Sequence, residues 1–281
     1  MASMNACVNL LQWQVLFAPK VRMKTAATSK HRLSLALLLA CFAHCARATE
    51  PGTVTAYRPS VSNPAQLPAV GQLEYEAGLV GIRDGDTRRD SMPVLFKLAF
   101  SPQWGVLVGG EAYVLARDAG GARARGLGDI AVVLKRAFLV DSAAAFGIEL
   151  AAKLPTAKDS IGSGKADYTL NTLYSQDLGK FHMDANANVT RLGAVEPGSG
   201  RHQAGLSAAF SNQFNERWSA TAELSGTRQR GTDTTAQVLL AAGYGPGKRM
   251  TIDFGVAHGL KGAAPNWSLF GGLVVALGQL W

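Results

Sequence analysis

The sequence predicts an all-β protein, a transmembrane antiparallel β-barrel of about 12 strands with short periplasmic turns and longer extracellular loops. Three observations lead to this fold class. Short segments of alternating large apolar and small or polar residues recur through residues 71–281, their connections alternate in length, and the chain ends on an aromatic residue. Single-chain bacterial barrels have an even number of such strands. A soluble β-sandwich is the alternative, but it does not call for interleaved short and long connections.

The closing strand, residues 267–281, shows the pattern best. Its large face includes Trp267 and Trp281, one near each end, and its other face consists mainly of glycine, alanine and serine. About 9–11 tilted residues cross a bilayer as a β-strand, and aromatic residues gather at both interfaces. The alternation places Gln279 on the large face as well. The residues expected to signal assembly to the barrel-assembly machinery are Leu273, Val275, Leu277 and Trp281.

Residues 1–48 have the parts of a cleaved secretory signal peptide. A basic stretch begins at Met23, an apolar run covers 33–43, and Ala46-Arg47-Ala48 is a small-residue cleavage site. Residues 1–22 precede this pattern, so we expect the true start to be Met23. Cys41 ends a weaker match to a lipoprotein box, which remains an alternative. The apolar run is too short for a membrane-spanning helix.

Removal of this segment changes the charge of the chain. The six basic residues of 1–48 account for most of the net +8, and the rest has 22 Lys and Arg against 20 Asp and Glu. A nearly neutral chain lacks the basic surface of a nucleic-acid-binding protein. All three cysteines, Cys7, Cys41 and Cys45, lie in the same segment, so no disulfide or thiolate site is expected. These features predict export to the outer membrane of a Gram-negative bacterium.

Residues 49–70 are rich in Pro, Ser and Thr and have no useful period. We interpret them as an extended lead-in, either periplasmic or inserted into the lumen, and place the barrel at residues 71–281. The expected strands before the last are 73–79, 94–100, 106–114, 129–135, 146–153, 168–175, 182–190, 203–210, 218–225, 235–244 and 250–256.

The alternation varies in quality along these segments. It is clearest at 182–190, where Met183, Ala185 and Val189 oppose polar residues. It is weakest at 106–114, where Glu111 and Tyr113 fall on one face. The short turns contain Pro, Gly, Asn or Asp and are 101–104, 139–142, 177–180, 212–217 and 245–249. The longer loops are 83–90, 117–126, 155–166, 193–201, 228–233 and 261–266.

The polar face of the strands is expected to line the lumen. Its charged and amide residues are Glu74, Glu76, Lys97, Glu111, Asp129, Lys135, Glu149, Lys153, His182, Asp184, Asn186, Asn188, Glu223 and Asp253. Acids outnumber bases in this set, which favours cations in an open pore. His182 and Asp184 could orient a general base, but a polar lining explains them equally well. No catalytic residue, metal site or cofactor is expected.

Three arginines fall on the outward face at the extracellular ends of strands: Arg83, Arg191 and Arg228. Guanidinium groups form bidentate hydrogen bonds with phosphates, so these residues are candidates for contact with lipopolysaccharide. Ordinary solvated charges at strand ends are the alternative.

Several short motifs occur in a recognisable order: RPSVSNP at 58–64, GLGDI at 126–130, KLPT at 153–156, GVAHGL at 255–260 and PNWS at 265–268. Together they resemble the outer-membrane family described as meta-pathway phenol-degradation proteins or transporters, over residues 57–281. The resemblance implies a barrel that passes small, partly apolar aromatic compounds. We therefore expect a passive channel for small solutes. The alternatives are a structural or surface-interaction barrel with a blocked lumen and, as the least favoured, a barrel enzyme acting on lipid or peptide.

Overall fold

The computed structural model describes residues 52–281, which form antiparallel β-strands joined by turns and loops. Within this range no helix is long and apolar enough to cross a membrane. The strands are β1 (Gln72–Asp84), β2 (Thr87–Ala99), β3 (Trp104–Arg117), β4 (Arg123–Gly126), β5 (Ile130–Leu139), β6 (Ala144–Leu154), β7 (Asp167–Leu178), β8 (Phe181–Arg191), β9 (His202–Gln213), β10 (Trp218–Gln229), β11 (Thr235–Gly247), β12 (Met250–Lys261) and β13 (Trp267–Gln279).

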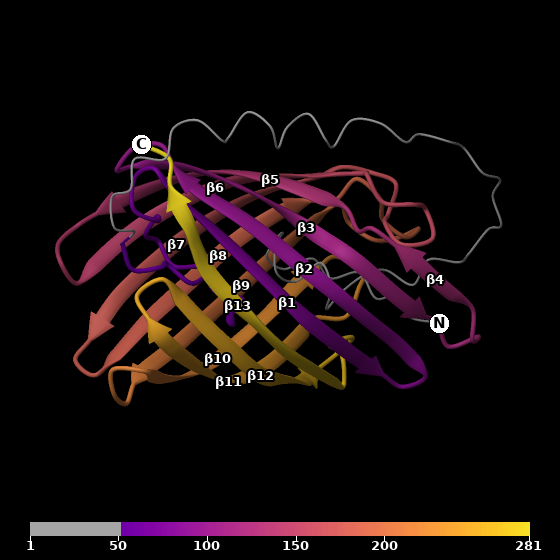
Figure 1. The fold of residues 1–281 in the computed structure, drawn as a ribbon. Helices are drawn as coiled ribbons and strands as arrows, with labels where there is room; N and C mark the ends of the chain where they lie inside the picture. Colours follow the sequence, from indigo (N-terminus) through magenta and orange to yellow (C-terminus); the bar gives the residue numbers. More distant parts are fainter. Residues whose placement is uncertain (1–51) are drawn as a thin grey trace.

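Twelve of these strands form a closed ring. Each pairs with its neighbours along the chain, with β3 passing directly to β5, and β13 pairs with β1 to complete the barrel. The four-residue β4 lies outside the ring and pairs only with the far half of β3. The strands cross the barrel obliquely (Figure 1). The closed ring confirms the predicted transmembrane barrel of about 12 strands. Closure also leaves no strand edge facing lipid.

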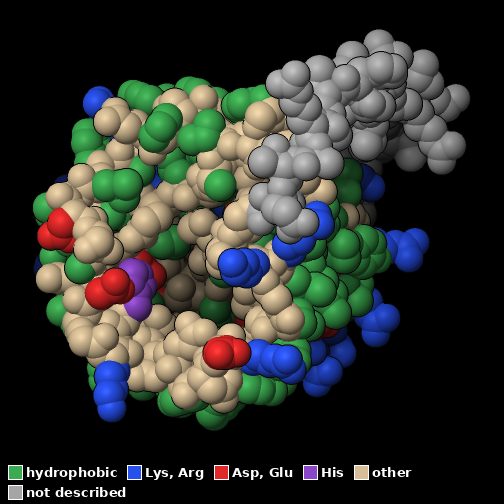
Figure 2. Space-filling view, turned by 60° about the vertical axis from the view of Figure 1, so that its left-hand side comes forward, with side chains coloured by type: hydrophobic (Ala, Val, Ile, Leu, Met, Phe, Trp, Pro, Cys, Tyr) green, Lys and Arg blue, Asp and Glu red, His purple; other side chains and the backbone are tan. Residues whose placement is uncertain are grey.

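Side chains alternate between the two faces of the barrel wall. On β6 the side chains of Phe146, Ile148 and Leu150 are exposed on the outer face, whereas Gly147 and Glu149 are buried inside. Figure 2 shows hydrophobic side chains gathered on the outer wall and a hollow at one end of the barrel. The arrangement is the reverse of a soluble sandwich, since the large apolar face points away from the interior.

A bulge in β3 changes the predicted faces of that strand. Met92 pairs with Tyr113 but Pro93 pairs with Glu111, so Ala112 is the extra residue. A bulge reverses the alternation beyond it. Glu111 therefore points inward, as predicted, but Tyr113 lies on the outer face with 46% of its surface exposed. Placing both on one face was wrong. Pro93 occupies the partner strand at the bulge, where a missing donor is tolerated.

A second irregularity affects the last strand. Leu73 pairs with Gly278 but Glu74 pairs with Ala276, so the register shifts at Leu277. Gln279 consequently pairs with the buried Gln72, and its amide donates to the Val70 carbonyl at 2.6 Å. The prediction that Gln279 shares the outer face with the apolar residues was wrong, again because a bulge interrupts strict alternation.

The connections at one end of the barrel are longer than those at the other, with one exception. β1 and β2 extend past their apolar portions and join through Gly85 and Asp86, so the expected loop 83–90 is a tight turn. Gly85 has a φ of 54°, which suits glycine in such a turn. The expected loop 117–126 contains β4.

The predicted signal peptide, the start at Met23, the lipoprotein-box alternative and the cleavage site at Ala48 all lie outside the described residues.

The two faces of the wall differ in their tolerance for charge. Ile148 lies between Phe146 and Leu150 on the outer face, so Ile148→Arg would place a guanidinium in hydrocarbon. We expect this change to lower the free energy of unfolding by about 2–4 kcal/mol. The control is Thr221→Arg, at a half-buried inner position on β10. Denaturant unfolding in lipid vesicles would measure both, and equal destabilisation would contradict the assignment of faces.

Candidate functional site: the barrel interior

Residues 52–70, here called the inner segment, run through the interior of the barrel. Tyr57, Val61 and Ala65 are almost completely buried, although the segment forms no secondary structure beyond an isolated bridge of Val70 with Ala99. In Figure 1 its indigo trace lies within the barrel, toward the end that carries the C-terminus. Its polar groups bond to inward-facing side chains of eight of the twelve ring strands. The inner segment is therefore attached to most of the circumference.

Two glutamates of β1 bind the start of the inner segment. Glu74 accepts a hydrogen bond from the Thr55 amide at 3.0 Å, and Glu76 accepts one from the Tyr57 amide at 2.8 Å. Lys97 of β2 forms salt bridges of 2.9 and 2.6 Å with the same glutamates and also donates to the Thr55 carbonyl. These buried charges compensate one another, which burial requires.

Tyr57 is held between two lysines. The ammonium groups of Lys97 and Lys135 each lie 4.4 Å from the centre of its ring, within cation–π range. Lys135 also donates to the Tyr57 hydroxyl at 2.6 Å and to the Pro64 carbonyl. Opposite it on β6, Glu149 lies 3.4 Å from Lys135 and accepts from the Asn63 amide group. One compact network therefore joins the residues near the start of the inner segment, at Thr55 and Tyr57, to those in its middle, at Asn63 and Pro64.

Arg58 bridges the lumen to β12. Its guanidinium donates two hydrogen bonds of 3.0 Å to the two carboxylate oxygens of Asp253, and both side chains are buried. Gly78 of β1 and Gly272 of β13 provide the space for it. A Cβ atom at either position would lie within 2.7 Å of the Arg58 guanidinium atoms. The two glycines thus leave room on the inner face of the wall for the Arg58 side chain.

The turn at residues 61–63 is held by side chains on the opposite wall. Glu223 of β10 accepts hydrogen bonds from the amides of Val61 and Ser62 at 2.6 and 2.9 Å. Asn186 of β8 accepts from the Asn63 amide at 2.7 Å and donates to its carbonyl at 2.9 Å. These residues were expected to line a pore, and here their polar groups satisfy backbone atoms of the inner segment.

A second charged cluster lies nearer the long-loop end. Lys153 is 2.8 Å from Asp167 and 3.4 Å from Asp129, and it donates to the Ser163 hydroxyl. Asp129 also accepts from the Ala157 amide at 2.8 Å. The loop 155–166 is therefore tied to the inside of the wall, and Ile161 of this loop is buried against β3 and β4. This loop narrows the interior at the end opposite to the start of the inner segment.

The remaining inward residues include one charged pair and a larger number of neutral polar side chains. Glu111 pairs with Arg89 at 2.5 Å. The amide group of Asn188 lies over Gly205, in space that a Cβ atom at that position would fill. The inner wall of β7–β11 is otherwise lined by neutral polar side chains that bond to one another: Thr169 with Thr190, Thr227 with Thr235, Gln203 with Gln229 and Ser225 with Gln237.

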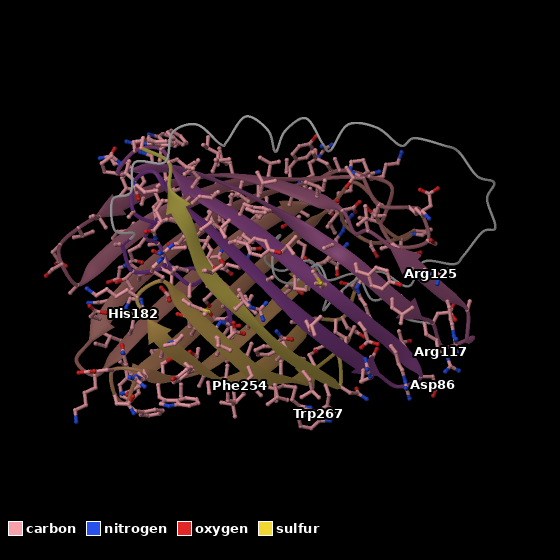
Figure 3. All side chains as sticks on the ribbon, in the orientation of Figure 1. Asp86, Arg117, Arg125, His182, Phe254 and Trp267 are labelled. Atoms are coloured by element: carbon pink, nitrogen blue, oxygen red, sulfur yellow. The ribbon has the colours of Figure 1, made fainter. Side chains whose placement is uncertain are left out.

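His182 lies at the end of the barrel opposite to Arg117 and Arg125 (Figure 3). Its ring nitrogens face Asp177 at 2.6 Å and Asp184 at 3.3 Å, and Asp184 also accepts from the Ser175 hydroxyl. Both nitrogens are thus taken by carboxylates, so His182 has none to accept a proton from Ser175. A nucleophile–base pair requires that contact. The group is better described as a polar rim of the interior.

Sequence reasoning missed several residues of this network, among them Tyr57, Arg58, Arg89 and Asp167. Arg89 and Asp167 lie at strand ends, beyond the apolar alternation that defined the expected strands. Arg58 lies in a segment without a period. The inward charges therefore include two more bases and one more acid than expected, and acids still predominate. Within residues 52–281 no group of His, Cys, Asp and Glu is arranged to hold a metal ion.

The outward candidates that belong to strands lie on the outer face of the barrel wall, and Trp281 follows the end of β13. Arg83, Arg191 and Arg228 are exposed at strand ends, and Arg83 pairs with Asp90 at 2.7 Å. Leu273, Leu277 and Trp281 are exposed and Val275 is half-buried.

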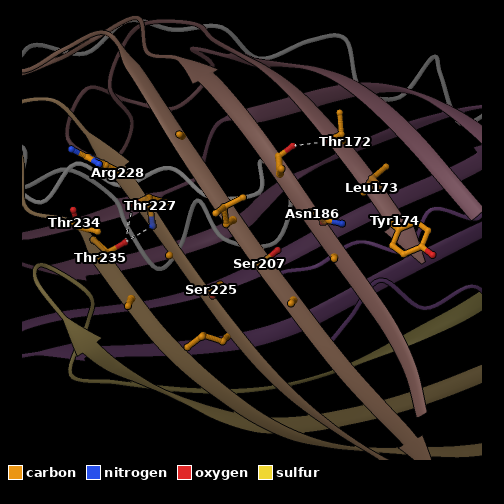
Figure 4. A pocket seen from close by; sticks show the side chains of 18 of the residues that line it. Thr172, Leu173, Tyr174, Asn186, Ser207, Ser225, Thr227, Arg228, Thr234 and Thr235 are labelled. Carbon is orange, nitrogen blue, oxygen red and sulfur yellow. Dashed lines mark hydrogen bonds between the residues drawn. The ribbon is translucent and has the colours of Figure 1, made fainter. Parts of the chain in front are cut away.

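A depression of about 850 Å³ is lined by residues of β6–β11 (Figure 4). Its side chains include the exposed Phe146, Leu206 and Leu224, with Ala187 and Ala204 between them. Inward-facing residues of the same strands, among them Asn186, Ser207 and Thr227, also border the depression.

Comparison with known proteins identifies the family of the chain. A family model described as "Putative MetA-pathway of phenol degradation" matches residues 56–277. The chain belongs to this family. The resemblance inferred from the motifs is confirmed. The matched residues cover nearly the whole barrel and most of the inner segment. A search of curated proteins finds no match to the sequence.

Solved structures share the fold of this phenol-degradation-family protein. The COG4313 outer membrane channel from Pseudomonas putida F1 superimposes with a TM-score of 0.61 at 13% identity, over 75% of this chain and 97% of the other. The NanC porin superimposes with a TM-score of 0.52 at 8% identity, over 73% of this chain and 100% of the other. At these identities the similarity establishes the barrel fold.

The Arg58–Asp253 pair should control the inner segment. Arg58→Ala would leave Asp253 buried without its cation, which costs about 3–5 kcal/mol in other proteins. We expect the inner segment to detach, and single-channel conductance in planar bilayers to rise above that of the unmodified protein. Arg58→Lys should give an intermediate conductance, because lysine keeps the charge but not the bidentate geometry. Unchanged conductance in Arg58→Ala would contradict this role.

Proposed function

We propose that the protein is a passive outer-membrane channel for small solutes. One observation supports this most directly: the closed ring encloses charged and polar side chains around an inner segment with almost no secondary structure, instead of a packed apolar core. A wall of this composition is suited to contact with water and polar solutes. Passive passage needs no cofactor, no catalytic residue and no conformational cycle.

Small neutral aromatic compounds are the solute class that best fits the interior. The family description points to phenol degradation. Phenol-like molecules carry one polar group on an apolar ring. The interior offers both kinds of surface: a neutral polar wall on β7–β11 and a cluster of Val80, Ile82, Leu239 and Phe270 on β1, β11 and β13. An aromatic carboxylate would instead meet the excess of inward acids.

A structural or surface-interaction barrel with a blocked lumen is the second candidate. The inner segment favours it, because its hydrogen bonds to eight strands fill much of the interior near one end. An enzymatic role is the least favoured, since His182 faces two carboxylates and has no free ring nitrogen for Ser175.

Electrophysiology separates these candidates. In planar bilayers under a KCl gradient, we expect a conducting pore whose reversal potential favours cations, because the inward charges are predominantly acidic. The preference should weaken toward ~1 M salt, where the Debye length is about 3 Å. In proteoliposomes, phenol should enter faster than benzoate. Anion preference at low salt would contradict the charge argument. An absence of conductance, both in the unmodified protein and in Arg58→Ala, would favour the blocked barrel.

Two further partners belong to this proposal. The barrel-assembly machinery would recognise the last strand through Leu273, Val275, Leu277 and Trp281. Lipopolysaccharide phosphates would contact outward arginines such as Arg83, Arg191 and Arg228. We place the mature protein in the outer membrane after cleavage near Ala48, with residues 49–70 forming the lead-in to the barrel.

Deletion of Trp281 tests the assembly signal. Trp281 is 56% exposed at the end of the last strand, and the barrel interior does not depend on its side chain. We expect the truncated protein to reach the periplasm but to yield less heat-modifiable protein in the outer-membrane fraction, as measured by semi-native electrophoresis. Deleting Pro197, an exposed residue of the loop between β8 and β9, is the control, because it also shortens the chain by one residue but leaves the last strand intact. Normal insertion of the truncated chain would refute the assignment.

A further inference from the structure

Four arginines lie opposite one another across β1–β4. The register pairs Arg83 with Arg88, Arg88 with Arg117, and Arg117 with Arg123. All four side chains are exposed on the outer face. Arg125, two residues further along β4, is exposed on the same face and pairs with Leu115. With a strand spacing of about 4.8 Å, the row spans roughly 14 Å of the wall.

This arrangement leaves positive charge uncompensated. Like charges placed directly opposite in a sheet destabilise it. Arg83 forms a salt bridge with Asp90, but in the part of the chain that the structure describes Arg88, Arg117, Arg123 and Arg125 form none. Asp118, in the adjoining turn, instead accepts a hydrogen bond from the Ala122 amide. An external anion would remove the repulsion.

The surface next to the arginines is apolar. The outward positions closer to the middle of the barrel are Leu79, Met92, Tyr113 and Leu115, and all are exposed. Met92 and Tyr113 are direct partners in the register. A charged row above an apolar surface matches a lipid with an anionic headgroup and acyl chains. Figure 3 shows Arg117 and Arg125 at the end opposite to His182, the end of the longer loops.

We infer that the outer surface of β1–β4 binds one molecule of lipid A, the phosphorylated glycolipid of lipopolysaccharide. Its phosphates would be bound by Arg88, Arg117, Arg123 and Arg125, and its acyl chains would lie on Leu79, Met92, Tyr113 and Leu115. A row of this length exceeds what one phosphate can contact, so a headgroup with two phosphates fits better than a phospholipid. Guanidinium groups bind phosphates through paired hydrogen bonds. The inference rests on the proposed outer-membrane location but not on channel activity.

The site has a direct binding test. The full-length protein in detergent would be titrated with lipid A, and binding followed by native mass spectrometry. We expect Arg88→Gln/Arg117→Gln/Arg123→Gln to weaken binding by about tenfold or more, since several charged hydrogen bonds are lost. The matched control is Lys180→Gln/Arg217→Gln/Lys248→Gln, which removes the same charge from exposed positions at the opposite rim. The control should bind lipid A normally.

Two further comparisons make the outcome decisive. Dephosphorylated lipid A and phosphatidylglycerol should both bind at least about tenfold more weakly than lipid A. Equal binding of either, or equal weakening by the control variant, would overturn the site. Should the triple variant fail to fold, Arg123→Gln/Arg125→Gln changes only β4, which lies outside the closed ring. We expect both variants to conduct like the unmodified protein. The lipid-binding result therefore tests this site, whether or not the channel proposal holds.

Discussion

The pairing of β1 with β13 is the constraint on which the rest of the molecule depends. The two strands at opposite ends of the barrel sequence pair from Gln72 with Gln279 to Arg83 with Trp267. In a bilayer, an unpaired strand edge would expose N–H and C=O groups to hydrocarbon, so a spanning sheet is stable only when closed. Closure fixes the circumference, and the circumference fixes how much space is left inside. A ring of twelve strands leaves more space than the inward side chains alone fill.

The inner segment occupies part of that space, and carboxylates hold it there. Glu74, Glu76 and Glu223 accept hydrogen bonds from its backbone amides, and Asp253 binds its only arginine. Buried backbone groups need such partners, since only Val70 at the end of the segment pairs with a strand, at Ala99 of β2. The acidic residues of the wall therefore have two roles: they set the potential of the interior and they satisfy the inner segment. A change in one role affects the other.

Local periodicity was enough to predict most of the fold. On β6 and β8 the faces follow directly from strict alternation, because no bulge interrupts either strand. The same rule failed at Tyr113 and Gln279, since one extra residue reverses every side chain beyond it and leaves no mark in composition. The charges that meet across the lumen were not predictable. Arg58 and Asp253 are 195 residues apart, and only the closed barrel brings them together. Ser175 and Asp184 are cross-strand partners that depend on the register of β7 with β8.

The contact between Arg58 and Asp253 also links the inner segment to the alignment of the wall. A strand that slips by one residue turns every side chain to the other face. If β12 were misaligned in this way, Asp253 would point into lipid, and Ile252 and Phe254, which would then face inward, carry no carboxylate to replace it. The same holds for Glu223 on β10 and Glu76 on β1. The inner segment can therefore form all of its hydrogen bonds only when several strands pair in the correct register. Its docked state is specific for the correctly paired barrel.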